Sequence, residues 1–314
     1  MPDSVSLNDT YPKDSSLKDS YLKVRLDALR QSQNADGGWG YFSGGVSGKD
    51  AGNRDSWLEP TAYAALALLG EPASDRAWKL LSSWQLPDGS WKPSANVGIS
   101  SWGTSLCVTI AIARNDWGPS TRKGVDWLLG SYGVESSLLN TVMAKIGLLK
   151  SERNLTLKSW PWKPGTSGWV EPTAHAIVAL KRVAAKWPSS ELADRVRIGE
   201  QQLADTRGRD GGWNYGSPMA LGVDLPSYPE TTALALLGLQ KKKGFEGAFD
   251  LAWRMMHDTP SPLARAWLVT SMRLHGMTPP EPVGDPTADT MITAVEALSA
   301  AEGNWKLMST GDAA

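Results

Sequence analysis

The sequence contains a repeated motif that constrains its fold more than any other feature. The motif has the form Leu-x3-Gln-x3-Gly-x-Trp, and one copy ends at Trp39 while another, 52 residues later, ends at Trp91. A third copy ends at Trp213 with Arg207 in place of the glutamine, and a partial fourth copy ends at Tyr132, where the glutamine would stand. Spacings of roughly 20 to 50 residues are typical of folds that stack one supersecondary unit many times.

The repeat also bears on an unusual aromatic composition. The 314 residues include 16 Trp but only 7 Tyr and 3 Phe. Tryptophan therefore replaces phenylalanine as the main aromatic residue, and we expect particular positions of the repeated unit to require an indole ring.

A second repeated unit marks the starts of apolar helices. Residues 57–62 read Trp-Leu-Glu-Pro-Thr-Ala, residues 169–174 read Trp-Val-Glu-Pro-Thr-Ala, and residues 228–233 read Tyr-Pro-Glu-Thr-Thr-Ala. Each unit continues into a segment rich in Leu and Ala. Proline is favoured in the first helical turn, where its missing N–H would have no partner anyway, and a glutamate there faces the positive end of the helix dipole. These units therefore predict helix N-termini.

The hydrophobic pattern predicts two classes of helix. Helices with a polar face are expected at 17–33, 74–85, 119–130, 191–206 and 246–257. Largely apolar, alanine-rich helices are expected at 59–70, 102–114, 171–184, 228–240 and 262–275. Because a helix that is apolar all round must be buried, we expect an all-α protein with an inner ring of helices inside an outer ring, an α/α toroid.

The sequence leaves the place of two further helical segments open. Residues 137–150 and 288–301 are expected to be helical, but their pattern assigns them to neither ring. Essentially no β-sheet is expected, since no stretch alternates polar and apolar residues with period two. We expect one toroid domain over 17–306, with flexible segments at 1–16 and 307–314.

Charge and cysteine content exclude several classes of protein. The 32 basic and 33 acidic side chains nearly cancel, which argues against a nucleic-acid binder. Cys107 is the only cysteine, so an internal disulfide framework and a multi-thiolate zinc site are excluded, and a reducing, cytoplasmic location is expected. No metal or other cofactor is expected. No apolar run approaches the roughly 20 residues of a transmembrane helix.

The Gln-x3-Gly-x-Trp pattern resembles the QW repeat of triterpene cyclases such as squalene-hopene cyclases. The resemblance extends over roughly residues 17–305. It implies the α/α toroid that these enzymes share with the β subunits of protein prenyltransferases. It also implies that Gln33, Trp39, Gln85 and Trp91 are structural, because in that family each motif ties an outer helix to its neighbour.

The chemistry implied by the resemblance is acid catalysis. Squalene-hopene cyclases protonate an alkene with an Asp-x-Asp-Asp-Thr-Ala motif at the start of an inner helix. That motif is missing from this sequence, but matching Thr-Ala to Thr-Ala places Glu59, Glu171 and Glu230 at its central, proton-donating Asp. The zinc ligands of protein prenyltransferases are also missing, since Ser105 stands where the Asp of Asp-x-Cys would precede Cys107.

The candidate site residues all lie near the starts of the apolar helices. If Glu171, Glu59 and Glu230 converge on one cavity, like-charge repulsion and burial would raise the pKa of at least one and supply a general acid. His175, one turn after Glu171, is a further catalytic candidate, with a packed core histidine as the alternative. The candidate ligand-binding aromatic residues are Trp57, Tyr63, Trp102, Trp169 and Tyr228. The structural alternatives are helix capping for the glutamates and packing between helices for the aromatic residues.

These observations predict a terpene cyclase-like or prenyltransferase-like protein. It would bind a small apolar, isoprenoid-like ligand in a central cavity and carry out an acid-initiated cyclisation or isomerisation. One alternative is a non-catalytic binding or assembly module that needs a second subunit or forms a homodimer. Another is a carbohydrate-processing α/α barrel, in which Trp side chains are sugar platforms and paired carboxylates are acid and base.

Overall fold

The computed structural model of the protein describes residues 15–42, 55–146, 148, 154–220 and 222–311, and the regular secondary structure of this part of the chain is almost entirely helical. The helices and strands are α1 (Ser15–Ser32), α2 (Leu58–Ala67), α3 (Pro72–Ser82), α4 (Thr104–Ala113), α5 (Pro119–Gly130), η2 (Val134–Ser136), α6 (Leu138–Lys145), α7 (Val170–Ala184), α8 (Ser190–Asp205), β1 (Met219–Ala220), β2 (Val223–Asp224), α9 (Pro229–Gly238), α10 (Glu246–Asp258), α11 (Pro262–Leu274), α12 (Thr290–Ser299) and η3 (Asn304–Met308).

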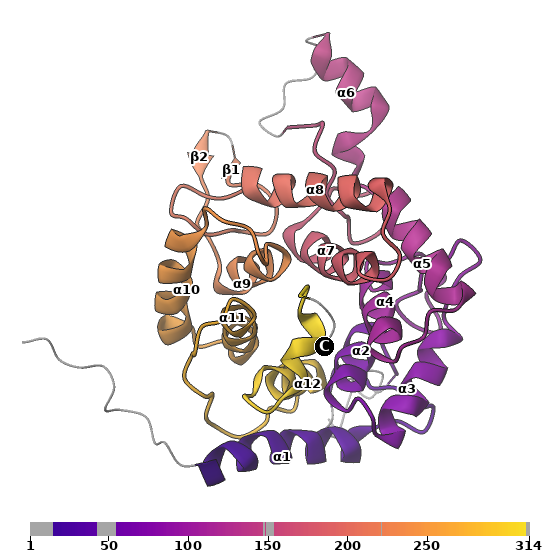
Figure 1. Ribbon diagram of the computed structural model, residues 1–314, viewed down its shortest axis with the longest axis vertical. Helices are drawn as coiled ribbons and strands as arrows, with labels where there is room; N and C mark the ends of the chain where they lie inside the picture. Colours follow the sequence, from indigo (N-terminus) through magenta and orange to yellow (C-terminus); the bar gives the residue numbers. More distant parts are fainter. Residues whose placement is uncertain (1–14, 43–54, 147, 149–153, 221, 312–314) are drawn as a thin grey trace, which may run out of the picture.

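Among the described residues, the helices form two concentric rings, which confirms the all-α toroid (Figure 1). The inner ring consists of α2, α4, α7, α9, α11 and α12, each in contact with the next, and α12 returns to α2. Outside it lie α1, α3, α5, α8 and α10 (Figure 1). The inner helices are largely apolar, since they pack against neighbours in both rings; in α4, for example, every residue from Thr104 to Ala111 is buried.

The repeated motif joins the two rings through its tryptophan. The indole Nε1 of Trp39 donates a hydrogen bond to the carbonyl of Leu29, ten residues earlier, at 2.9 Å. The backbone N–H of Trp39 donates to the hydroxyl of Thr61 on the next inner helix, also at 2.9 Å. Both contacts recur at Trp91, Trp160 and Trp213. The threonine of Glu-Pro-Thr-Ala thus holds the tryptophan of the other repeated unit.

The glutamine of the motif joins one outer helix to the next. Gln33 donates to the carbonyls of Gly37 and Ala73, and Gln85 makes the equivalent pair of bonds. In the degenerate third copy, Arg207 donates to the carbonyl of Gly211 at 2.8 Å, so its guanidinium replaces the amide.

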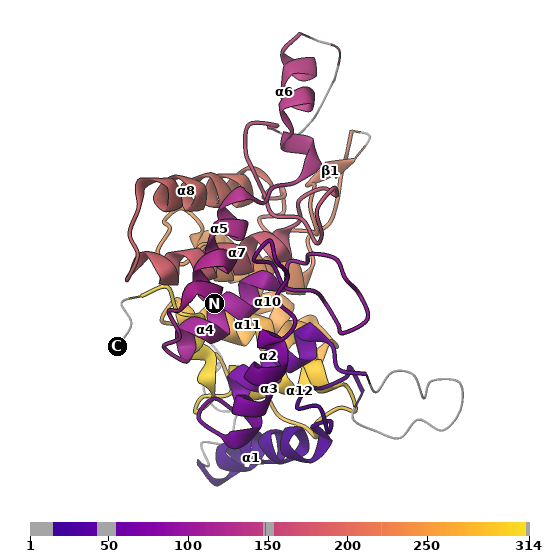
Figure 2. The ribbon, with the colours of Figure 1, turned by 90° about the vertical axis from the view of Figure 1, so that its right-hand side faces the viewer.

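The fourth copy of the motif is completed by a tryptophan that lies far along the chain. Trp160 donates from Nε1 to the carbonyl of Leu128, 32 residues earlier, whereas the separation in the first copy is 10 residues, so 22 residues are inserted. The insertion carries α6, which projects beyond both rings (Figures 1 and 2). The guanidinium of Arg195 lies 3.2 Å above the Trp160 ring and donates to the carbonyls of Ser131 and Lys158.

Three expectations are resolved or corrected by the structure. Segment 288–301 contains α12 and closes the inner ring, whereas 137–150 contains α6 and belongs to neither ring. The expectation of essentially no sheet holds apart from a two-stranded antiparallel hairpin, β1 and β2. The expected flexible segment 1–16 is wrong for residues 15 and 16, which begin α1, and residues 1–14 lie outside the described part.

The expectation of a flexible tail is wrong for residues 307–311, which pack against the carboxyl ends of the inner helices. The side chain of Met308 is buried, and its carbonyl accepts a hydrogen bond from Gln240 at 2.9 Å. Asn304 donates to the carbonyls at the end of α2. Because η3 contacts α2, α4, α11 and α12, this segment covers one end of the inner ring; residues 312–314 lie outside the described part.

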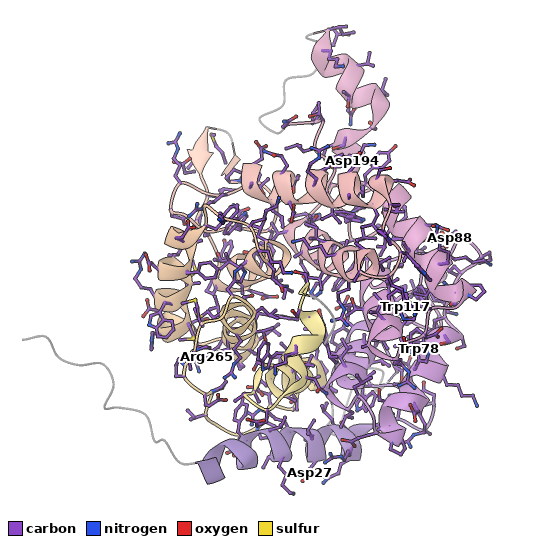
Figure 3. The ribbon with its side chains drawn as sticks, in the orientation of Figure 1. Asp27, Trp78, Asp88, Trp117, Asp194 and Arg265 are labelled. Carbon is purple, nitrogen blue, oxygen red and sulfur yellow. The ribbon has the colours of Figure 1, made fainter. Side chains whose placement is uncertain are left out.

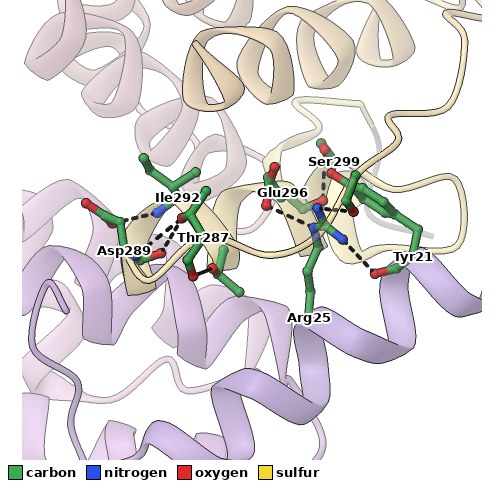
Figure 4. A network of polar contacts seen from close by, with 9 residues as sticks. Tyr21, Arg25, Thr287, Asp289, Ile292, Glu296 and Ser299 are labelled. Carbon is green, nitrogen blue, oxygen red and sulfur yellow. Dashed lines mark hydrogen bonds and ion pairs between the residues drawn. The ribbon is translucent and has the colours of Figure 1, made fainter. Parts of the chain in front are cut away.

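The first outer helix is held to the last inner helix by a buried ion pair (Figure 4). Arg25 of α1 donates from Nε to Glu296 of α12 at 2.9 Å, and its Nη1 donates to the carbonyl of Tyr21. Asp289 caps α12 by accepting the N–H of Ile292 at 3.0 Å. These contacts join the two ends of the helical chain and close the toroid.

Candidate functional site

The starts of four inner helices are tied together at one end of the toroid by backbone hydrogen bonds. In each bond, the N–H of a residue at a helix start donates to the carbonyl of the residue two positions after a motif tryptophan. The pairs are Leu58 to Pro93, Trp102 to Trp162, Val170 to Tyr215 and Thr290 to Tyr41, at 2.7 to 3.0 Å. The segment that contains η3 covers the opposite end of the inner ring.

Glu59 is held in place by two donors. Its Oε2 accepts a hydrogen bond from the Tyr41 hydroxyl at 2.9 Å, and its Oε1 accepts one from the indole of Trp102 at 3.0 Å. Burial raises the pKa of the Glu59 carboxyl, and these two hydrogen bonds oppose the increase. The carboxyl is therefore fixed in orientation.

Glu171 occupies the same position in α7 but makes no side-chain hydrogen bond within the described part of the chain. Burial raises its pKa well above the usual range, and the nearby charges of Glu59 and Glu230 raise it further. Burial also raises the pKa of Glu230, whose carboxyl is likewise without a hydrogen bond to a described residue. The structure thus brings the three glutamates of the repeated unit into one electrostatic cluster. Among the described residues, the carboxyls of Glu171 and Glu230 accept no hydrogen bond from a helix N–H, and their place in the first helical turn keeps them near the positive end of the helix dipole.

Figure 3 shows the side chains that lie between the helices. One turn deeper than the glutamates, buried aromatic side chains from different inner helices come together. The hydroxyl of Tyr63 on α2 lies 3.2 Å from Nε2 of His175 on α7. Trp267 on α11 has its ring 5.5 Å from both of these rings, and Trp102 lies 5.4 Å from His175. These residues come from different inner helices and lie one turn below the three glutamates. We call Tyr63, His175, Trp267 and Trp102 the floor of the site.

His175 is a neutral residue of this floor. Burial lowers its pKa to about 3, since the charged imidazolium would lose its hydration among aromatic rings. The sequence predicted His175 to lie on the same helical face as Glu171, and the structure places it below that residue, in contact with Tyr63. Its surroundings match the packed core histidine that the sequence left as the alternative.

The buried state of His175 predicts a loss of stability in acid. The unfolded chain protonates this residue near pH 6.5 and the folded chain only near pH 3, so between these values the unfolded state binds more protons and stability falls as the pH falls. At pH 4.5 the expected cost is roughly 2 to 3 kcal/mol. Urea unfolding at pH 7 and pH 4.5 measures this loss. Between the two pH values, the free energy of unfolding of His175→Phe should fall less than that of the wild-type protein, by this amount. Equal losses in both proteins would contradict the prediction.

Two groups of aromatic side chains surround the glutamates, and we call them the walls of the site. Trp57 lies 6.1 Å from Tyr41 between ring centroids, and Trp102 lies 5.1 Å from Trp162. On the other side, Tyr215 lies 6.5 Å from Trp169 and 5.3 Å from Tyr228. Of the five predicted aromatic residues, Tyr63 belongs to the floor, Trp102 reaches both floor and wall, and the other three belong to the walls.

Sequence reasoning missed four aromatic residues of the site. Tyr41, Trp162 and Tyr215 each stand two positions after a motif tryptophan, and this spacing is a signal that could have identified them. Trp267 lies inside α11, whose start carries no glutamate, and the sequence contains no comparable signal for it.

The described residues include no group of three or more His, Cys, Asp or Glu side chains arranged to hold a metal ion. They also include no helix with the length and apolar character needed to cross a membrane.

Comparison with known proteins supports the fold. No protein-family model matches the sequence, and no curated protein matches it. A variant of the type II terpene cyclase MstE from Scytonema, in complex with geranylgeranyl dihydroxybenzoate, is similar in structure, with a TM-score of 0.53, 14% identity, and coverage of 93% of this chain and 97% of that chain. An α-1,6-mannanase of Salegentibacter in complex with α-1,6-mannotriose has a TM-score of 0.59 at 10% identity, over 90% and 98% of the two chains.

A third similar structure is the endoglucanase of glycosyl hydrolase family 8 from Klebsiella pneumoniae, with a TM-score of 0.56 at 14% identity, over 88% and 97% of the chains. Terpene cyclases and glycosidases thus both share this architecture, and at such identities the similarity extends to the fold and no further. The chain has the α/α-barrel fold of type II terpene cyclases and of α/α-barrel glycosidases.

Proposed function

We propose that the protein binds an apolar, isoprenoid-like ligand between the aromatic walls and uses Glu171 as a general acid to start its isomerisation or cyclisation. The observation that carries the proposal is the environment of Glu171. Its carboxyl has no hydrogen-bond partner among the described residues, lies near two other carboxyls, and stands above a floor of aromatic rings. Such a carboxyl keeps its proton at higher pH than an ordinary glutamate and can give it to a ligand.

The proposed reaction begins at a carbon–carbon double bond of the ligand. The π electrons take the proton of Glu171, which leaves a carbocation on the more substituted carbon and a carboxylate on Glu171. Aromatic faces stabilise a cation through their ring quadrupoles, and Trp102, Trp57 and Trp162 offer such faces. Loss of a proton from a neighbouring carbon to a carboxylate or to water forms a new double bond. Glu59, held by Tyr41 and Trp102, is the fixed negative charge of the site.

The experiment is incubation of the protein with polyprenyl alcohols, polyprenyl hydrocarbons and polyprenylated phenols, followed by mass spectrometry of the extracted products. We expect an isomer of the starting mass, because protonation and deprotonation leave the composition unchanged. The rate should fall as the pH rises through the raised pKa of Glu171, since only the protonated carboxyl donates. Absence of product from every substrate class would contradict the proposal.

A carbohydrate-processing function is the second candidate, because a specific feature favours it. Trp169, Tyr215 and Tyr228 are exposed beside Glu230, and aromatic side chains next to carboxylates are typical of glycosidase sites. Incubation with mannan and cellulose oligosaccharides distinguishes the two functions: release of shorter oligosaccharides would favour the glycosidase, and their persistence together with an isomerised isoprenoid would favour the cyclase-like reaction.

A further inference from the structure

Three adjacent aromatic side chains are exposed at the end of the toroid where the inner helices begin, and we call them the aromatic corner: Trp169, Tyr215 and Tyr228. Their exposed fractions are 36%, 48% and 43%. They come from three separate segments. Trp169 precedes α7 and Tyr228 precedes α9. Tyr215 lies in a loop, and its carbonyl accepts a hydrogen bond from the N–H of Val170 at the start of α7. Large aromatic residues gathered at the surface are uncommon in soluble proteins and indicate a binding surface.

The rings of the aromatic corner are inclined to one another. Trp169 and Tyr215 meet at 68° with centroids 6.5 Å apart, and Tyr215 and Tyr228 meet at 39° with centroids 5.3 Å apart. A sugar ring stacks on a single flat aromatic face, whereas inclined faces enclose a compact, rounded group on more than one side. The geometry therefore suits a compact group better than a flat ring.

Two carboxyls, those of Glu230 and Glu171, lie beside the aromatic corner. The charges of Glu230 and Glu171 contribute to raising the pKa of Tyr215, after burial, so both carboxyls lie near its hydroxyl. Neither glutamate forms an ion pair with a described Lys, Arg or His. Arg209, in the segment that precedes Tyr215, is engaged with Asp224 at 2.9 Å. An anion would therefore find no free described cation among these residues, whereas a cation would be attracted by the carboxylate of Glu230.

We propose that the aromatic corner binds a substituted ammonium group of the ligand, with Glu230 as its counter-ion. Aromatic faces combined with a carboxylate are the surroundings in which proteins bind quaternary and methylated ammonium groups. The inference goes beyond the proposed function because it names the chemical class of the ligand's head group. It requires no turnover, since an inert cation tests it.

The experiment compares choline with 3,3-dimethyl-1-butanol, its neutral isostere in which carbon replaces the ammonium nitrogen. Binding of each is measured by calorimetry and by ligand-observed NMR. The expected result is that choline binds about tenfold more tightly, because cation–π contacts with more than one ring and the attraction of a neighbouring carboxylate together supply the 1.4 kcal/mol that a factor of ten requires. Trp169→Leu and Glu230→Gln should each reduce choline binding toward that of the isostere.

Matched control variants separate this site from the rest of the surface. Tyr132→Leu removes a tyrosine of similar exposure, 41%, on the inserted segment, and Glu302→Gln removes an exposed glutamate after α12. Neither should change choline binding. Equal affinity for choline and its isostere, no detectable choline binding, or displacement of choline by mannose or inorganic phosphate would each overturn the inference. Turnover of an isoprenoid without choline binding would overturn the inference and leave the proposed function standing.

Discussion

Replacing Glu171 by glutamine is expected to lower turnover of an isoprenoid substrate by roughly 10²- to 10⁴-fold, the range associated with loss of a general acid. Glutamine has nearly the same shape as a protonated glutamate but cannot release a proton to an alkene. Because the Glu171 carboxyl makes no hydrogen bond to a described residue, its replacement leaves no partner unsatisfied. The first measurement is the initial rate of product formation at saturating substrate concentration. The second is the affinity for an analogue without double bonds, which should change little.

Two comparisons make this result specific to proton donation. Glu302→Gln, an exposed change far from the helix starts, should keep the wild-type rate and pH profile. Tyr41→Phe should slow the reaction less than Glu171→Gln, because it removes one of the two hydrogen bonds that orient Glu59 and leaves Glu171 in place. A Glu171→Gln protein that retained most of its activity would refute the assignment of the acid and direct attention to Glu230.

Replacing Trp91 by alanine is expected to destabilise the protein by roughly 3 to 5 kcal/mol, the usual cost of removing a large aromatic side chain from a core. The ring is fully buried and its Nε1 donates to the carbonyl of Leu81 at 2.9 Å. The neighbouring helix α5 approaches so closely that a Cβ on Gly124 would stand 2.7 Å from the ring. Loss of the indole therefore leaves a cavity between two helices and removes one of the two hydrogen bonds that the Leu81 carbonyl accepts, the other coming from the N–H of Trp84.

Urea unfolding followed by circular dichroism measures this effect, provided that the transition is two-state. Trp169→Ala is the matched control, since this tryptophan is 36% exposed and belongs to no copy of the motif. We expect its midpoint to shift much less than that of Trp91→Ala. Similar shifts in both variants would show that the motif tryptophans are no more structural than the others.

Much of the fold could be predicted because it is local and repeated. The expected helix at 119–130 matches α5 exactly in its bounds, and the other expected helices differ by only a few residues at their ends. Apolar periodicity and prolines in first turns act within a single helix, so they can be identified in the sequence without knowing the fold. The placement of Glu59, Glu171 and Glu230 at the starts of inner helices was predicted on the same basis, since equivalent positions of a repeat face the same end.

Other features depend on contacts between distant segments. The sequence reveals only part of the fourth copy of the motif, because its tryptophan, Trp160, follows an insertion of 22 residues. The floor of Tyr63, His175 and Trp267 joins three helices that are not neighbours in the sequence. The packing of residues 307–311 could not be predicted from their composition, because their partners are side chains far away in the sequence. Gln240 donates to the carbonyl of Met308 and accepts the N–H of Thr310, and Arg182 donates to the carbonyls of Leu307 and Ser309.

The sequence by itself determined the number of repeated units, the places where the inner helices begin and the alignment of their glutamates, because these follow from local periodicity. The tertiary structure alone decided that those glutamates differ. Glu59 is held by Tyr41 and Trp102, whereas Glu171 has no partner among the described residues and lies near two other carboxyls. The physical reason is that a proton affinity depends on burial and on neighbouring charges, and only the closed ring of helices brings those neighbours together.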